Sequence, residues 1–321
     1  MRGFTPLVIV IIVAVVGVGA FMLGRFEQPT VTSFPSPSTN PQQSQIMEAG
    51  NELLRHHAYI TFSSDGKTWK GGDLVRKSAS VPDLIQLTKD AGEFKKGDLL
   101  VYFVDPTVMK GPGTEGLGIL SSSDLGKSWT ESGHIKLTGK SNKGGAVDPS
   151  VVQIEDGTLR LYYFGSEITQ GDPAKQEGKH KVYSAKSTDG INFTVEERVR
   201  WEDNRLTDPE VIYFNNNWFM YYSTGAESKL ATSTDGLNFT GIKITGGNVG
   251  GVPGALAVDG GVRLFGCSKG ISTAFASDGI NFKPEQTDIL SIKGVVCDPA
   301  AIKLSDGRYA LLYKIVEGGS Q

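Results

Sequence analysis

The apolar residues of this chain occur in short runs that come in pairs, and the first run of each pair contains a proline near its start. These first runs, the proline motifs, are "VPDLIQL" (81–87), "DPSVVQI" (148–154), "DPEVIYF" (208–214), "VPGALAV" (252–258) and "DPAAIKL" (298–304). The second runs are "LLVYFV" (99–104), "LRLYYFG" (159–165), "WFMYYS" (218–223), "VRLFGC" (262–267) and "YALLYK" (309–314). Short runs rich in β-branched and aromatic residues predict pairs of adjacent β-strands.

A polar motif built on an aspartate, a nearby glycine and a closing aromatic residue alternates with these pairs. Its five copies, the Asp turns, are "SSDGKTW" (63–69), "SSDLGKSW" (122–129), "STDGINF" (187–193), "STDGLNF" (233–239) and "ASDGINF" (276–282). In such a turn the carboxylate accepts hydrogen bonds from backbone amides, and glycine supplies a positive φ. We interpret the Asp turns as scaffold.

Two paired strands, a third that enters the Asp turn and a fourth that leaves it make a four-stranded unit. Five such units predict an all-β fold, a five-bladed β-propeller of four-stranded antiparallel blades, which we number by their proline motifs. The chain begins with an unpaired Asp turn and ends with an unpaired proline motif. We therefore expect residues 58–75 to complete the last blade beside 298–314, which removes an open sheet edge.

The amino-terminal region has a different composition. Residues 7–24 contain no charge, which predicts a membrane-spanning helix or the core of a signal peptide. With Arg2 on the cytoplasmic side, the rest of the chain lies outside the cytoplasm, either anchored or secreted after cleavage. The expected domains are an anchor or signal peptide (1–25), a Pro/Ser-rich linker (26–50) and the propeller (51–321).

Composition narrows the classes of partner. The 321 residues carry a net charge of −3, which gives no basis for nucleic-acid binding. The spacing of His, Cys, Asp and Glu predicts no metal site and no cofactor, although it leaves open a structural ion on the propeller axis. Cys267 and Cys297 are compatible with one disulfide in an oxidising compartment, or with two buried thiols.

Carboxylates flank the prolines that open the innermost strands. Asp148, Asp208 and Asp298 precede a proline, and Asp83 and Glu210 follow one. Residues two apart share one side of a strand, so we expect all five near the axis, with Asp298 as a substrate-binding candidate. Like charges held this closely keep one carboxyl protonated, as acid/base catalysis requires. The alternative is that Asp-Pro simply begins the strand.

Three further side chains are candidates for substrate binding at the same end of the propeller. Trp201 precedes an innermost strand and has a ring suited to stacking on a sugar. Arg205 is placed either to hold substrate or to pair with a carboxylate, and His180 ends the long loop 165–181. A second long loop, 105–116, lies at this end, and long loops on a rigid scaffold commonly carry binding residues.

The repeated "DPxV" strand openings and "S-x-DG-x-x-F/W" turns of residues 58–321 resemble the five-bladed glycosidase superfamily. It includes the arabinanases and β-xylosidases of glycoside hydrolase family 43, invertases and levansucrases. By blade number, the resemblance implies Asp83 as general base, Asp148 as the group that orients and tunes it, and Glu210 as general acid. The chain departs from the pattern at Val81, where the family has an aspartate, and at Asp208, which displaces the acid to Glu210.

Three functions are therefore considered. The first is a glycoside hydrolase with a carbohydrate substrate, held at a membrane through residues 7–24. The second is a catalytically inactive propeller that binds a glycan or a protein partner. The third is a sialidase-like exo-glycosidase, because "SSDLGKSW" matches the Asp turn of sialidases, although those have six blades.

Overall fold

The computed structural model describes residues 52–108, 116–139, 146–165 and 178–318. The expected anchor, its membrane span and the linker up to residue 50 lie outside the described residues, as do the central parts of both long loops. Within the described ranges, no helix has the length and apolar character needed to cross a membrane.

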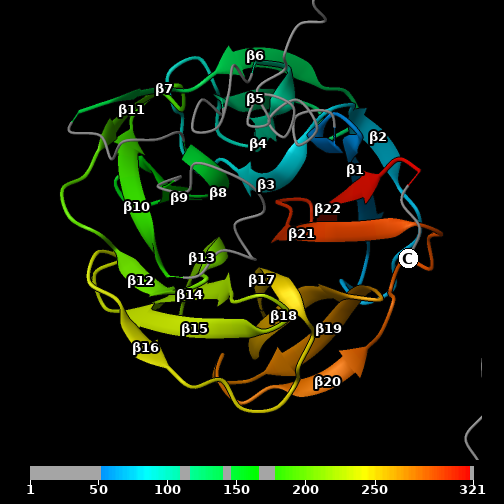
Figure 1. Ribbon diagram of the computed structural model, residues 1–321. Coiled ribbons are helices and arrows are strands. Elements are labelled where there is room, and N and C mark those ends of the chain that lie inside the picture. Colours follow the sequence, from blue (N-terminus) through cyan, green and yellow to red (C-terminus); the bar gives the residue numbers. More distant parts are fainter. Residues whose placement is uncertain (1–51, 109–115, 140–145, 166–177, 319–321) are drawn as a thin grey trace, which may run out of the picture. The chain divides into compact units, whose positions relative to one another are not determined.

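Five antiparallel sheets surround a common axis, with one innermost strand from each (Figure 1). The first blade contains β3 (Ser80–Gln86), β4 (Leu99–Asp105), β5 (Gly116–Ser122) and β6 (Thr130–His134). The second contains β8 (Ala146–Gln153), β9 (Leu159–Gly165), β10 (Lys179–Ser187) and β11 (Asn192–Val195). The third contains β13 (Thr207–Phe214), β14 (Asn217–Ser223), β15 (Ser228–Ser233) and β16 (Thr240–Ile242). The other two contain β17 (Gly251–Val258), β18 (Gly261–Ser268), β19 (Gly270–Ala276) and β20 (Lys283–Gln286); and β21 (Val295–Lys303), β22 (Tyr309–Val316), β1 (His56–Ser63) and β2 (Asp73–Arg76). The predicted five-bladed propeller of four-stranded blades is confirmed.

Two short strands extend the second blade. β7 (Lys136–Thr138) pairs with β11 in parallel, and β12 (Trp201–Asn204) pairs with the first four residues of β10. A single 3-10 turn, η1 (Pro106–Val108), follows β4 among the described residues.

The fifth blade combines segments from both ends of the described chain. β1 pairs with β22 along its whole length, from His56 opposite Val316 to Ser63 opposite Tyr309. The sheet order is β2-β1-β22-β21, so the early strands lie on the outside of the blade and the late strands on the inside.

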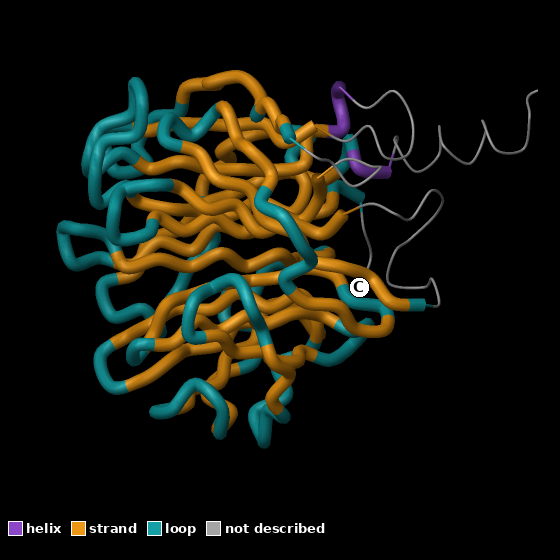
Figure 2. The backbone as a smooth tube through the Cα atoms, turned by 90° about the vertical axis from the view of Figure 1, so that its left-hand side faces the viewer, coloured by secondary structure: helices purple, strands orange, loops and turns teal. Residues whose placement is uncertain are grey.

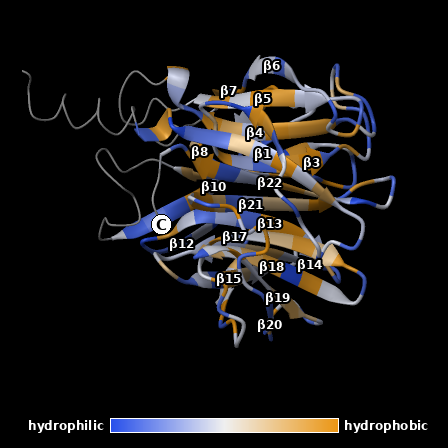
Figure 3. Cartoon of the chain, turned by 90° about the vertical axis from the view of Figure 1, so that its right-hand side faces the viewer, coloured by the Kyte–Doolittle hydropathy of each residue, from blue (hydrophilic) through white to orange (hydrophobic). Residues whose placement is uncertain are grey.

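Apolar side chains pack between neighbouring blades. Figure 3 shows hydrophobic stretches along many of the strands. Every residue of β4 is buried, because both faces of its sheet contact another blade. Three buried tyrosines also tie one blade to the next by donating a hydroxyl hydrogen bond to a glycine carbonyl in an Asp turn. These pairs are Tyr102–Gly190 (3.0 Å), Tyr162–Gly236 (2.8 Å) and Tyr221–Gly279 (2.7 Å).

The Asp turns join the two outer strands of each blade, at the end of the propeller opposite the proline motifs. Figure 2 shows the propeller from the side, with loops at the ends of the strands. In the turn of Asp189, one carboxylate oxygen accepts the amides of Ile191 and Asn192 at 2.9 and 2.7 Å. The aspartates of the other four turns likewise accept two amides each; they are Asp65, Asp124, Asp235 and Asp278. These bonds explain why an aspartate recurs in every turn.

Candidate active site at the propeller axis

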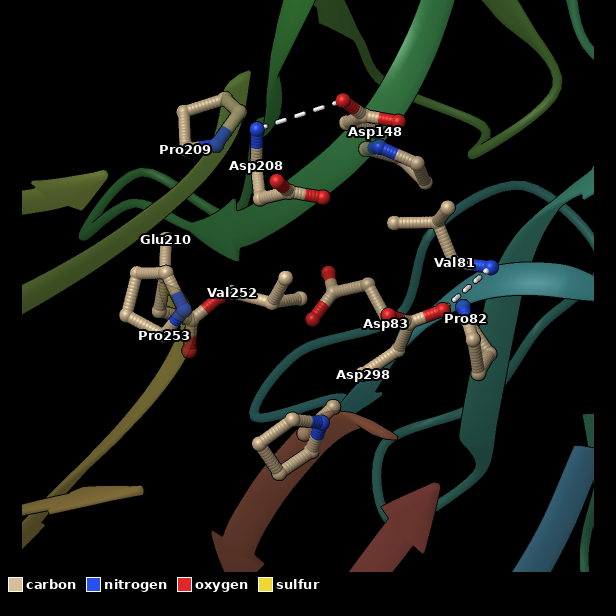
Figure 4. A pocket seen from close by; sticks show the side chains of 13 residues that line it. Val81, Pro82, Asp83, Asp148, Asp208, Pro209, Glu210, Val252, Pro253 and Asp298 are labelled. Atoms are coloured by element: carbon tan, nitrogen blue, oxygen red, sulfur yellow. Dashed lines mark hydrogen bonds between the residues drawn. The ribbon is translucent and has the colours of Figure 1, made fainter. Parts of the chain in front are cut away.

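The proline motifs of all five blades line one cavity on the axis (Figure 4). The cavity has a volume of about 30 Å³, which is room for one or two waters. The carboxylates expected to converge all line this cavity, and they are Asp83, Asp148, Asp208, Glu210 and Asp298. They come from four of the five blades.

Each innermost strand has a bulge at its proline. The residue before the proline has a φ between 44° and 53° in every blade; these residues are Val81, Asp148, Asp208, Val252 and Asp298. Aspartate tolerates this left-handed conformation much better than a β-branched residue does. Local backbone geometry thus accounts for part of the recurrence of Asp-Pro, and the two valines are under strain.

The carboxylates before the prolines join neighbouring blades around the cavity. Asp148 Oδ2 accepts the backbone amide of Asp208 at 3.2 Å, and Asp298 Oδ2 accepts that of Val81 at 3.2 Å. In the fourth blade the equivalent amide, from Val252, donates to Ser223 Oγ at 3.2 Å.

The residues after the prolines form a second set of links between blades. Asp83 accepts the amide of Val151 at 2.6 Å, and Glu210 accepts that of Ala255 at 3.3 Å. In the second blade, Ser150 occupies the position after the proline. Its Oγ accepts the amide of Val211, in the third blade, at 2.9 Å and donates to Glu210 at 3.3 Å. A neutral serine therefore makes the same link, so the charge of Asp83 and Glu210 has no structural necessity.

Burial changes the protonation of three of these carboxyls. It raises the pKa of Asp83 to about 7, and Asp83 is only 6% exposed. Burial also raises the pKa of Glu210 well above its usual range, with a second contribution from the charge of Asp83. The pKa of Asp148 is raised first by burial and then by the charge of Asp208. Protonated carboxyls are therefore present on the cavity near neutral pH.

Lys314 is a cavity neighbour that the proline motifs did not reveal. Its ammonium lies 2.7 Å from Asp298 Oδ2 and its side chain is 12% exposed. It belongs to β22, the second strand of its blade, where a lysine ends an apolar run. Because Asp298 is engaged by Lys314 and by the amide of Val81, it is poorly placed to bind substrate.

His56 and Ser80 lie at the same junction of the fifth and first blades, 2.8 Å apart from Nδ1 to Oγ. The pKa of His56 falls to about 4, chiefly through burial and then through the charge of Lys314. The imidazole is therefore neutral at physiological pH.

The other three substrate-binding candidates lie away from the described lining of the axial cavity. Trp201 packs on Tyr222, with ring centroids 6.3 Å apart, because β12 folds onto the edge of β10. His180 is 6% exposed, and its Nδ1 lies 2.9 Å from the carbonyl oxygen of Leu206. Trp201 and His180 therefore do not line the axial cavity, and their contact with substrate stays a prediction. The backbone amide of Arg205 donates to Gly178, outside the cavity.

Cys267 and Cys297 form a disulfide between β18 and β21, with their Cα atoms 5.4 Å apart. The bond joins the fourth and fifth blades directly beside Asp298. Of the two open alternatives, the structure has the disulfide. Among the residues that the structure describes, no group of three or more His, Cys, Asp or Glu is arranged to hold a metal ion.

Comparisons with known proteins place the fold. No protein-family model matches the chain, and no curated protein matches it by sequence. The α-L-arabinofuranosidase Arb93A from Fusarium graminearum superposes with a TM-score of 0.55 at 14% identity, covering 81% of this chain and 92% of its own. This chain has the fold of the five-bladed propeller glycosidases.

Two further structures agree with this fold. The α-L-arabinanase of Penicillium chrysogenum, solved with arabinobiose, superposes with a TM-score of 0.53 at 15% identity, over 84% of this chain and 96% of its own. The GH43_1 enzyme from Xanthomonas citri gives 0.55 at 12% identity, over 75% and 84%. The resemblance inferred from the motifs is thus shown at the level of the fold.

Proposed function

We propose that this protein is a glycoside hydrolase whose reaction takes place at the axial cavity. The observation that carries the proposal is the convergence of five carboxylates from four blades on one space, with burial holding several of them protonated. Glycosidic hydrolysis requires one protonated carboxyl for the leaving oxygen and one ionised carboxylate beside it. The named activities of the similar structures favour arabinose- or xylose-containing glycans as substrates.

Asp148 and Asp208 are the pair best suited to the chemistry. Both are half-buried, they lie on the innermost strands of neighbouring blades, and the charge of Asp208 contributes to the raised pKa of Asp148. We assign proton donation to Asp148 and the ionised role to Asp208. Glu210, also half-buried and with a raised pKa, is the alternative acid named by the family resemblance.

Asp83 receives a supporting role in this proposal. It is 6% exposed and its carboxylate is held by the amide of Val151, so a substrate reaches it less readily than the half-buried Asp148 and Asp208. Its charge raises the pKa of Glu210, which makes Asp83 a group that tunes its neighbours.

The test is hydrolysis of aryl α-L-arabinofuranosides, aryl β-xylosides, arabinan and xylan by the purified chain. We expect turnover by the wild type and its loss in Asp148→Asn and Asp208→Asn, with Asp156→Asn, an exposed carboxylate, as the matched control. The absence of hydrolysis of every furanoside and pyranoside by the wild type would exclude the proposal.

A non-catalytic propeller that binds a glycan or a protein is the second candidate. Two observations favour it: the small size of the axial cavity, and the valines at two of the five positions before the prolines, Val81 and Val252. It predicts saturable binding of arabinan or xylan by the wild type without release of reducing ends. The sialidase-like alternative is less favoured, since the propeller has five blades.

We further propose that the propeller acts outside the cytoplasm, tethered through residues 7–24 or released after cleavage. The Cys267–Cys297 disulfide supports this location, because disulfides persist in oxidising compartments. Protease accessibility on intact cells, together with the amino-terminal sequence of the mature protein, would test the location and the cleavage separately.

A further inference from the structure

A second cavity lies between the fourth and fifth blades at the Asp-turn end. It has a volume of about 240 Å³, compared with about 30 Å³ for the axial cavity. Side chains from β18, β19 and the first Asp turn contribute to its walls, among them Arg263, Phe275 and Lys67. We call it the rim cavity.

The repeat of the blades shows which residues correspond between the rim cavity and the equivalent junction of the second and third blades. Arg263 lies two residues before Phe265, which is opposite Gly254 in the ladder. Arg160 lies two residues before Tyr162, which is opposite Ser150. The two arginines are therefore equivalent, and both are buried.

Each of these arginines makes a two-bonded ion pair within its own blade. Arg160 Nε and Nη2 donate to Glu196 at 2.9 and 3.1 Å, and Arg263 Nε and Nη2 donate to Glu285 at 2.6 and 3.2 Å. The same device is thus present at both junctions, and the rim cavity lies beside the one between the fourth and fifth blades.

The two junctions differ in one further arginine. At the junction of the second and third blades, Arg200 is 6% exposed and its Nη1 donates to the carbonyl of Leu237, in the neighbouring Asp turn, at 3.3 Å. The amide of Arg200 donates to Val182, and in the fourth blade the equivalent amide, that of Ile289, donates to Ile271. Ile289 has no guanidinium, and at this junction Arg263 Nη1 itself donates to the carbonyl of Gly66 in the first Asp turn, at 3.1 Å.

The charges around the rim cavity are already compensated. Arg263 is paired with Glu285, and Asp65 accepts the amides of Lys67 and Thr68 in its own turn. Asp259 has Lys303 3.5 Å away. A lining of satisfied charges offers many hydrogen-bonding groups but no excess charge to select an ion, so it suits a neutral ligand rich in hydroxyl groups.

Size and apolar surface narrow the class of ligand further. The half-buried rings of Phe275 and Tyr309 give the cavity apolar walls. Its volume is below the ~300–1,000 Å³ typical of pockets for drug-sized ligands, which is appropriate for one sugar ring.

We propose that the rim cavity binds one sugar unit of a neutral glycan, as a surface site at the end of the propeller opposite the axial cavity. The inference takes its class of ligand from the proposed function but does not require that the axial cavity be catalytic. Its consequence is that a polymer is retained on the protein independently of the axial carboxylates.

The experiment measures binding of soluble arabinan and xylan to the full chain by affinity electrophoresis and calorimetry. Phe275→Ala removes an apolar wall, and Ile289→Arg introduces a guanidinium at the position equivalent to Arg200, whose side chain reaches the neighbouring Asp turn. We expect each to weaken polysaccharide binding by about tenfold or more. Lys186→Ala is the matched control, since Lys186 faces Arg160 as Phe275 faces Arg263. All three variants should keep the native circular dichroism spectrum, and hydrolysis of a small aryl glycoside, where present, should be unchanged.

Retention of polysaccharide binding by Asp148→Asn, together with its loss in Phe275→Ala and Ile289→Arg, would support the rim site. Unchanged affinity in both rim variants, binding lost only in axial variants, or no binding of either polysaccharide by the wild type would overturn it. Because binding is the readout, a wild type that binds polysaccharide but hydrolyses nothing refutes the proposed hydrolase and leaves the rim site supported.

Discussion

Both ends of this propeller carry aspartates, in all five blades at the Asp-turn end and in four at the axial end, but in opposite electrostatic environments. At the Asp-turn end Asp235 is exposed, and hydrogen bonds from its own turn hold its pKa well below the usual range. At the axial end Asp83 and Asp148 are desolvated, and their pKa values are raised. The pKa of each aspartate is therefore decided by the balance of desolvation against hydrogen bonding. Its residue type and its recurrence in the blades do not decide it.

The largest expected effect tests whether only one end carries chemistry. Asp148→Asn and Asp208→Asn should lower kcat on an aryl arabinofuranoside by roughly 10²–10⁴-fold, the range typical of a lost acid or base. The Asp-turn variant Asp235→Ala should leave kcat near the wild-type value. A comparable loss of kcat in Asp235→Ala, with the fold intact by circular dichroism, would remove the distinction between the ends.

The second prediction uses the opposite pH dependence of the two ends. Asp83 has a pKa of about 7 when folded and about 4 when unfolded, so the folded state binds more protons between these values. Stability should therefore fall as pH rises from 4 to 7, by up to about 4 kcal/mol from this group. Asp83→Asn should abolish that part of the slope in urea unfolding measured at several pH values.

The aspartates of the Asp turns should give stability the opposite pH dependence, so that their contribution is lost as pH falls. These aspartates have lowered pKa values, so their contribution is present above about pH 4 and lost as pH falls through the folded pKa. An unchanged pH slope in Asp83→Asn would contradict the assignment of a raised pKa to the axial end.

The third prediction concerns the disulfide beside the axial carboxylates. It closes a separation of 30 residues, for which chain entropy predicts about 3–4 kcal/mol of stabilisation. The double variant Cys267→Ser/Cys297→Ser should lose stability by that order in urea unfolding, and reduction of the wild type should have the same effect. Equal stability of the oxidised and reduced wild type would show that the bond does not constrain the unfolded chain.

The smallest expected effect concerns the contribution of one Asp turn to the stability of the fold. Asp235→Ala removes the acceptor for the amides of Leu237 and Asn238 and should cost about 1 kcal/mol, as loss of a comparable cap does. The conservative variant Asp235→Asn retains one acceptor oxygen and should cost less. Urea midpoints of the two variants, compared at pH 7, give the answer, and a larger loss for Asn than for Ala would contradict the capping role.

Local sequence was sufficient to predict the blades, because each blade is specified by signals within a few tens of residues. An Asp turn requires an aspartate, a glycine and an aromatic residue close together, and a proline motif marks where an innermost strand begins. Counting these signals predicted five blades and the end of the propeller on which the carboxylates gather.

Tertiary structure alone decided what each side chain near the site contacts. Three contacts join residues on different strands or in distant parts of the sequence. They are the ion pair of Lys314 with Asp298, the hydrogen bond from Val151 to Asp83, and the contact of buried His180 with Leu206. Neither periodicity nor turn chemistry encodes such contacts, since they depend on how the blades pack and on where each strand bulges. The sequence by itself determined the repeating scaffold, whereas the protonation and accessibility of the axial carboxylates arise from burial that exists only once the five blades surround the axis.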